Sequence, residues 1–332
     1  MTLMEPSMPQ TLETDRWPPR PRVSSRFYKG HGLGNDYLVF EDCRGVAEGD
    51  APSDRLWVAT PENVARVCDR HRGLGADGIV VVAAGESVEN GPQMRVSLRM
   101  FNPDGGEFER SGNGLRILAS YLARKNGQLE IIDAEVGGDA VRMQLHANVD
   151  GACDISIDMG RARTGPAAIH ARPGLLAGDV SPFTVAGPDG EVLRVVPVWV
   201  GNPHLVVLVT DAGPRFGEET LARLGPFLAT HPEIPYGTNV QLVRAVGRRS
   251  EALIWERGVG RTSASGTSAC AVAVSLVHVG ARSPGTVSID MPGGHLNVTV
   301  GGALDVVLRG PVEPVMTGVL ETGLLATFEP GP

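Results

Sequence analysis

Two short polar segments, each followed at once by an apolar run, constrain the fold of this chain more than any other feature. The first is Arg110-Ser111-Gly112-Asn113-Gly114 before residues 115–123, and the second is Thr262-Ser263-Ala264-Ser265-Gly266-Thr267 before an apolar run that ends near residue 277. Ser, Thr and Gly at such junctions favour helix N-caps, because their oxygens or bare backbone serve the unpaired N–H groups of the first turn. Those N–H groups and the positive end of the helix dipole form a pocket for a carboxylate or phosphate.

The two segments stand in matching contexts. Each follows a charged turn, residues 102–107 in the first copy and 256–260 in the second, and each places Ser-Gly directly before its helix. One such cap is an ordinary structural feature, whereas two copies indicate two related halves of the chain. We therefore expect both helix N-termini to face one cleft.

Size and charge narrow the class of protein. The length of 332 residues predicts two domains, and a hydrophobic fraction of 42% provides ample core. A net charge of -8 argues against a nucleic-acid partner. No apolar run approaches the ~18–20 residues that span a bilayer, so no membrane association is expected. The N-terminus lacks the apolar stretch of a signal peptide, which predicts a cytoplasmic location.

The four cysteines are widely separated, at Cys43, Cys68, Cys153 and Cys270. They form no C-x-x-C pair and no cluster with histidine at the spacing of metal ligands. The sequence therefore predicts no metal site and no disulfide framework. Each cysteine is expected to be a small buried hydrophobic residue.

Read in order, the chain alternates strands and turns around a few helices. Residues 1–25 are expected to form a mobile tail, and a helix over residues 61–70 has Thr60 as its predicted N-cap. The run 160–178, rich in Arg, Pro, Gly and Ala, is the candidate crossover between domains. Another helix is expected over residues 218–228. The predicted strands lie at 26–29, 37–40, 79–82, 94–101, within 129–159, and at 192–200, 205–209, 240–243, 252–255, 285–300, 303–308 and within 310–328.

With these segments laid out, the chain resembles the diaminopimelate epimerases, which are cofactor-independent amino-acid epimerases. The resemblance runs from about Phe27 to the C-terminal strand, and its ordered segments are residues 29–36, 69–78, 101–105, 111–114, 201–204, 237–239 and 255–260. It implies an α+β fold of two pseudo-twofold related domains, each a curved, mostly antiparallel sheet wrapped round a central helix. The expected boundaries are a disordered tail 1–25, an N-terminal domain 26–157 plus 312–330, and a C-terminal domain 158–311.

The resemblance also implies a reaction and its residues. The reaction is two-base proton transfer at the α-carbon of LL- or meso-diaminopimelate, in lysine and peptidoglycan precursor biosynthesis, with a small-molecule substrate and no cofactor. A homodimer is one of the oligomeric states that the sequence allows. The distal amino-acid end would be held by Asn35, Asn102, Asn202, Asn239, Arg257 and the backbone at Glu256. The carboxylate at the reacting carbon would receive N–H groups at Gly112, Asn113, Gly266 and Thr267, while His204 and Glu256 would tune the two acid/base groups.

The sequence departs from the family at the two acid/base positions, where the family has cysteines and this chain has Ser111 and Ser265. In addition, Arg261 stands where a Glu is usual and Gly78 where the family often has a side chain. A thiol has a pKa of about 8.5, which a helix N-terminus lowers. A serine hydroxyl is far less acidic and needs an adjacent base, for which His204 and Glu256 are the candidates.

Three interpretations of the serines are open from the sequence. The first is an epimerase inactivated by substitution of both cysteines. The second is a natural divergent racemase or lyase, and the third is an amino-acid-binding protein without turnover. Arg110 and Arg261, which flank the serines, look natural rather than engineered and so favour the divergent enzyme somewhat. Arginine beside a thiolate or oxyanion favours the charged form.

Overall fold

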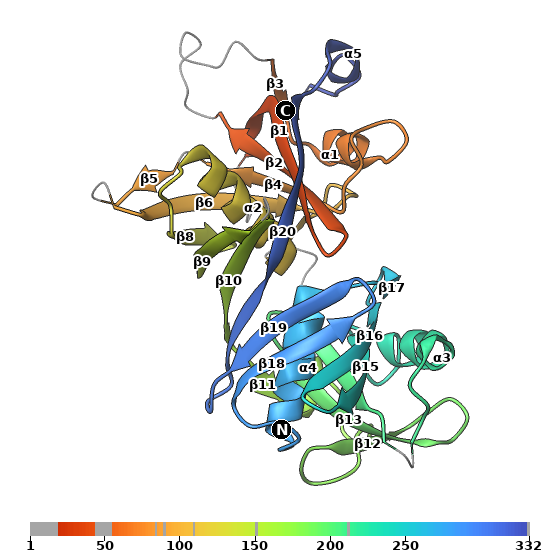
Figure 1. The fold of residues 1–332 in the computed structure, drawn as a ribbon. Coiled ribbons are helices and arrows are strands. Elements are labelled where there is room, and N and C mark those ends of the chain that lie inside the picture. The colour runs from red at the N-terminus through yellow and green to blue at the C-terminus, as the bar shows by residue number, and fades with distance from the viewer. Residues whose placement is uncertain are drawn as a thin grey trace, which may run out of the picture.

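The computed structural model describes residues 19–43, 55–83, 85–88, 91–108, 110–149, 152–210 and 213–330. It has two lobes, one above the other in Figure 1, and in each lobe strands wrap around a central helix. The upper lobe encloses α2 (Gly112–Lys125) and the lower lobe encloses α4 (Gly266–His278). Both helices begin at the predicted Ser-Gly junctions. The predicted α+β fold class, with a curved sheet around a helix in each half, is confirmed.

The strands of the upper lobe close into a ring around α2. Each strand pairs with the next in the order β1, β2, β4, β6, β8, β9, β10 and β20, and β20 returns to β1. Only β2–β4 and β6–β8 in this ring are parallel pairs. The bounds are β1 (Arg22–Gly32), β2 (Asn35–Asp42), β4 (Ile79–Val82), β6 (Gln93–Phe101), β8 (Ile131–Val136), β9 (Asp139–Val149), β10 (Ala152–Arg161) and β20 (Asp305–Val319).

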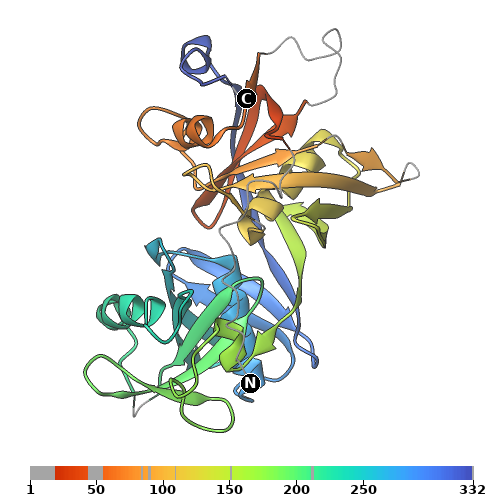
Figure 2. The ribbon, with the colours of Figure 1, turned by 180° about the vertical axis from the view of Figure 1, so that it is seen from behind.

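The lower lobe repeats this arrangement around α4, as Figure 2 shows from behind. Its strands pair in the order β13, β14, β15, β16, β18, β19 and β20, with parallel pairs at β14–β15 and β16–β18. Parallel pairs thus fall at corresponding places in both lobes, as a pseudo-twofold repeat requires. The bounds are β13 (Val192–Trp199), β14 (Pro203–Leu208), β15 (Asn239–Val246), β16 (Arg249–Glu256), β18 (Gly285–Met291) and β19 (Gly294–Val300).

The long strand β20 belongs to both lobes. It pairs with β19 up to Arg309 and with β1 from Glu313 onward, while β10 lies along its first half. The sequence predicted separate strands at 303–308 and within 310–328, but a single strand runs through both. Pairing with β10, in which Ile155 lies opposite Gly310, keeps it extended between its partners in the two lobes. Because β20 pairs with strands of both lobes, strand pairing does not assign it to one domain. The predicted domain boundaries stay a prediction.

The N-terminal end of the described chain differs from expectation. The tail was predicted to reach Ser25, whereas β1 begins at Arg22 and buries Val23, Ser24 and Ser25. Val23 pairs with Trp57 of β3 (Leu56–Val58), a long-range contact that overrides the polar, proline-rich local composition. The rest of the predicted tail, residues 1–18, lies outside the described residues.

The remaining elements are helices and short strands that do not belong to the two rings. α1 (Pro61–Cys68) has Thr60 as its N-cap, with a bond of 3.2 Å from the Asn63 N–H to Thr60 Oγ1, and ends two residues before the predicted end. The predicted crossover at 160–178 contains the end of β10, β11 and a 3-10 helix (Pro166–Ile169). The other bounds are α3 (Glu218–Ala229), α5 (Thr322–Leu325), β5 (Glu86–Ser87), β7 (Glu107–Phe108), β11 (Arg163–Thr164), β12 (Phe183–Ala186) and β17 (Gly260–Thr262). Within the described ranges no helix is long and apolar enough to cross a bilayer.

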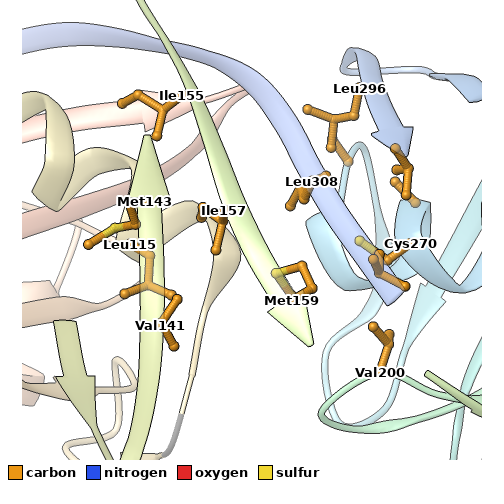
Figure 3. Packing of buried hydrophobic residues seen from close by; sticks show 14 of the residues in the cluster. Leu115, Val141, Met143, Ile155, Ile157, Met159, Val200, Cys270, Leu296 and Leu308 are labelled. Atoms are coloured by element: carbon orange, nitrogen blue, oxygen red, sulfur yellow. The ribbon is translucent and has the colours of Figure 1, made fainter. Parts of the chain in front are cut away.

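One hydrophobic core runs through both lobes without interruption. Figure 3 shows Leu115 of α2 packed near β9 and β10, while Met159 and Leu308 continue the packing toward Cys270 of α4. Each fully buried Leu, Ile or Met side chain contributes roughly 1.5–3 kcal/mol. The four cysteines are free and buried, as the sequence predicted. The core therefore ties the two central helices to the shared strands.

Candidate active site

One cavity receives the N-termini of both central helices. Its volume is about 400 Å³, which lies in the range of small-molecule sites. Ser111 of α2 and Ser265 of α4 both line it. Every predicted site residue except His204 lies on its wall, namely Asn35, Asn102, Ser111, Gly112, Asn113, Asn202, Asn239, Glu256, Arg257, Ser265, Gly266 and Thr267.

Two glycines allow the helix starts to approach each other. A Cβ atom placed on Gly112 would lie 3.1 Å from Leu308 Cδ2, and one on Gly266 would lie 2.9 Å from the same atom. Leu308 is fully buried on β20, so it cannot swing into solvent. Glycine directly after each serine therefore brings both helices against one side chain of the shared strand, which places Ser111 and Ser265 at the same cavity.

Ser111 acts as the N-cap of α2. Its Oγ accepts a hydrogen bond of 3.1 Å from the Gly114 N–H, and its backbone is extended, with φ −127° and ψ 123°. The hydroxyl of Tyr37 interacts with the Ser111 hydroxyl. Burial raises the pKa of Tyr37, which keeps that phenol protonated at neutral pH. The α2 side of the cavity thus presents two neutral hydroxyl groups in contact.

Ser265 has a different partner. Its side chain makes no capping bond to α4 and instead interacts with the carboxylate of Glu256, at the end of β16. Burial raises the pKa of the Glu256 carboxyl, and the bond from Ser265 offsets part of that rise. A carboxylate of raised pKa beside a hydroxyl is an arrangement that suits general-base chemistry. The two serines are therefore chemically unequal, a distinction that the sequence does not show.

His204 lies behind the cavity wall. It is fully buried on β14, and burial lowers the pKa of its imidazole to about 3, so the ring is neutral. Gln241 Nε2 donates to His204 Nδ1 at 3.0 Å, which leaves Nε2 to donate to Asn202 Oδ1 at 2.6 Å. The resemblance implies a tuning role for His204 at an acid/base group, which stays a prediction; its described bonds orient Asn202.

Backbone and side-chain bonds orient the asparagines of the cavity wall. Asn239 accepts the Arg257 N–H at 2.9 Å and donates to the Pro203 carbonyl at 3.0 Å. Asn113 Nδ2 donates to Asn35 Oδ1 at 2.8 Å, and Asn35 Nδ2 donates to Asp77 Oδ2 at 2.9 Å. Because these bonds use both the carbonyl oxygen and the amino group of Asn35 and of Asn239, the orientation of these side chains is determined before any ligand binds.

Tyr37, two positions after Asn35, is a cavity residue that the sequence does not predict. Its ring has space because position 78 is glycine: a Cβ there would lie 2.4 Å from Tyr37 Cε1. This contact gives a physical reason for the missing side chain at Gly78. Arg110 also lines the cavity, whereas Arg261 forms an ion pair of 2.5 Å with Glu218 of α3.

Comparison with known proteins agrees with this architecture. The sequence profile of the family described as diaminopimelate epimerase matches residues 27–165 and 196–315. Diaminopimelate epimerase 1 of a Nostoc species is 34% identical over 295 residues, which cover 83% of this chain and 92% of that protein. The diaminopimelate epimerase of Desulforudis audaxviator is 37% identical over 282 residues, covering 81% of this chain and 89% of that protein.

Solved structures share the fold at low sequence identity. A hydroxyproline epimerase from Agrobacterium vitis, with bound trans-4-hydroxy-L-proline, aligns with a TM-score of 0.60 and 16% identity over 93% of this chain and 96% of that chain. A phenazine biosynthesis protein of the PhzF family from Bacillus anthracis aligns with a TM-score of 0.57 and 15% identity, over 91% and 99% of the two chains. The fold and the family profile together define a protein of the amino-acid epimerase and isomerase class. Within that class, the chain belongs to the diaminopimelate epimerase family.

Proposed function

We propose that this protein is an amino-acid epimerase that binds diaminopimelate, or an amino acid of closely similar shape, with its α-carbon between Ser111 and Ser265. The observation that carries the proposal is the cavity itself, where two helix N-termini each present a serine. The N–H groups of Gly112, Asn113 and Gly266 belong to first turns, where no intrahelical partner exists. They suit the carboxylate attached to the reacting carbon.

The same cavity suits a second amino-acid end. It contains amide side chains, including Asn202 and Asn239, and the guanidinium of Arg257. Amides can accept from an ammonium group and donate to a carboxylate, while arginine grips a carboxylate with two parallel bonds. A zwitterion at each end of the ligand therefore matches the polar groups available, which supports a diaminopimelate-like substrate.

Proton transfer follows from the unequal partners of the serines. The Glu256 carboxylate takes the Ser265 proton while the Ser265 oxygen takes the proton from the α-carbon, so that Glu256 ends as a neutral carboxyl group. On the opposite face, the Ser111 hydroxyl delivers its proton to the carbon, and the Tyr37 hydroxyl, which stays protonated, stabilises the Ser111 oxygen that remains. Exchange with solvent after product release restores both sides.

A second candidate is ligand binding without turnover. It is favoured by one observation, because the Ser111 oxygen already accepts from the Gly114 N–H and has no carboxylate partner among its described contacts. A hydroxyl so placed is a weaker proton donor and acceptor than a thiol at the same helix N-terminus. Both candidates require the same ligand pose, and they differ only in proton exchange.

The deciding experiment follows the α-proton of diaminopimelate in heavy water by proton NMR, with binding measured in parallel by calorimetry. An epimerase exchanges the α-proton for deuterium and converts the LL form to the meso form. Binding with no exchange over many hours selects the second candidate. Neither binding nor exchange overturns the assignment of the ligand.

A further inference from the structure

Arg116 is a buried arginine directly beneath the two helix N-termini. It lies on α2, one turn after the Ser111 cap, and its side chain is fully buried. Cβ positions on Gly266 of α4 and Gly310 of β20 lie 3.7 Å from its Nη1 and Cζ atoms, respectively. On β1, a Cβ at Gly32 would lie 2.8 Å from its Nη2. The guanidinium therefore fills a space between α2, α4 and the two strands.

Its hydrogen-bonding groups are mostly unused. Nη2 donates to Asn113 Oδ1, but Nε and Nη1 are buried with no partner in the described part of the chain. No ion pair of the described residues includes it, and the interactions with the Cys270 thiol and the Asp154 carboxylate only partly offset the effect of burial on its pKa. Burial lowers its pKa to about 10, so the group remains charged at neutral pH. An uncompensated buried charge is a considerable cost to the folded state.

The surroundings of Arg116 point to the missing anion. Asn113, which accepts its bond, and Gly266, which lies against Nη1, both line the cavity. The charge of the guanidinium thus lies behind the same cavity wall as the two positive helix ends. Because the guanidinium is fully buried, its interaction with an anion in the cavity is screened less than that of a charge on the surface.

We propose that Arg116 is the built-in counter-charge for a ligand carboxylate held at the two helix N-termini, and that it acts as a positioning residue through Asn113. The proposal rests on the proposed function for the identity of the ligand. It adds that the free protein holds a buried positive charge which that carboxylate neutralises. When the α-carbon loses its proton, negative charge spreads onto this carboxylate, and Arg116 favours that state.

The proposal predicts opposite effects on stability and binding, which a purely structural role would not produce. Arg116→Met removes the charge but keeps much of the volume, so the free protein should melt at or above the wild-type temperature. Its affinity for meso-diaminopimelate should fall at least tenfold, and Arg116→Lys should recover part of that loss. The matched control is Arg99→Met, because Arg99 is buried against Glu107 at 2.5 Å. That change strands a carboxylate and should lower the melting temperature.

The experiment measures the melting temperatures of the wild type and the three variants without ligand, with meso-diaminopimelate and with sulfate. Calorimetry measures the affinity of each protein for meso-diaminopimelate. Sulfate probes the anion site independently of the substrate. If sulfate stabilises the wild type but diaminopimelate does not, the assignment of the ligand is overturned, while Arg116 is retained as the counter-charge of an anion. Stabilisation of the wild type by neither anion overturns the counter-charge. An Arg116→Met protein that binds as tightly as wild type overturns it too, as does one that melts as low as Arg99→Met or fails to fold.

Discussion

Replacing Glu256 by Gln tests the central chemical assignment. Glutamine keeps the shape of the side chain and an oxygen that can accept from the Ser265 hydroxyl, but it cannot take up a proton. A positioned general base accelerates a proton transfer by roughly 10²–10⁴-fold. That range corresponds to about 2.7–5.5 kcal/mol of activation free energy at ~1.36 kcal/mol per decade. We expect Glu256→Gln to slow α-proton exchange by this amount.

Although Glu256→Gln should slow exchange, it should not lower the free energy of unfolding at neutral pH. Burial raises the pKa of Glu256 above its usual value of 4.5, so the folded state binds more protons than the unfolded state between the two pKa values. Stability therefore falls as the pH rises through that window, and the charged form is a cost at neutral pH. Glutamine removes this cost, so the variant should be at least as stable as wild type at pH 7 and its melting temperature less dependent on pH.

The assay is deuterium exchange at the α-carbon, followed by NMR over a range of pH, with calorimetry to show that the ligand still binds. For the wild type, the exchange rate should fall as the pH drops through the raised pKa of Glu256, because protonation removes the base. A Glu256→Gln protein that binds diaminopimelate and exchanges at the wild-type rate refutes the assignment of Glu256 as the base.

Three further changes test other parts of the site. Restoring cysteine with Ser111→Cys and Ser265→Cys should raise the exchange rate by several orders of magnitude, because thiols at helix N-termini ionise far more readily; an unchanged rate counts against the substrate. Arg257→Ala leaves a ligand carboxylate unpaired, which should weaken binding by ~1–3 kcal/mol in calorimetry, and unaltered affinity contradicts the pose. Leu308→Ala should reduce the free energy of unfolding by ~2–5 kcal/mol in denaturant titration. The matched change Val307→Ala, at a side chain that is 37% exposed, should have little effect. Equal losses for the two variants would contradict the packing of both helix starts against Leu308.

The corrections to the predicted fold share one cause. Proline-rich composition suggested a tail up to Ser25, and Gly310 suggested a break near the C-terminus. Pairing of Val23 with Trp57, and of β20 with strands of both lobes, outweighs those local preferences. Strand pairing joins residues far apart in the sequence, so local composition contains little information about it.

The sequence by itself determined where the two central helices begin and the polar groups around their first turns. Helix starts depend on residues within one turn, so the N-cap positions of Ser111 and Ser265 could be recognised from their immediate neighbours, although only Ser111 makes a side-chain capping bond. Only the tertiary structure decided which partner each serine has. Glu256 reaches Ser265 from β16, Tyr37 reaches Ser111 from β2, and Arg116 is left unpaired because the space around it is closed by both lobes. These contacts depend on the ring of strands around each helix, and they decide whether a hydroxyl can act in proton transfer.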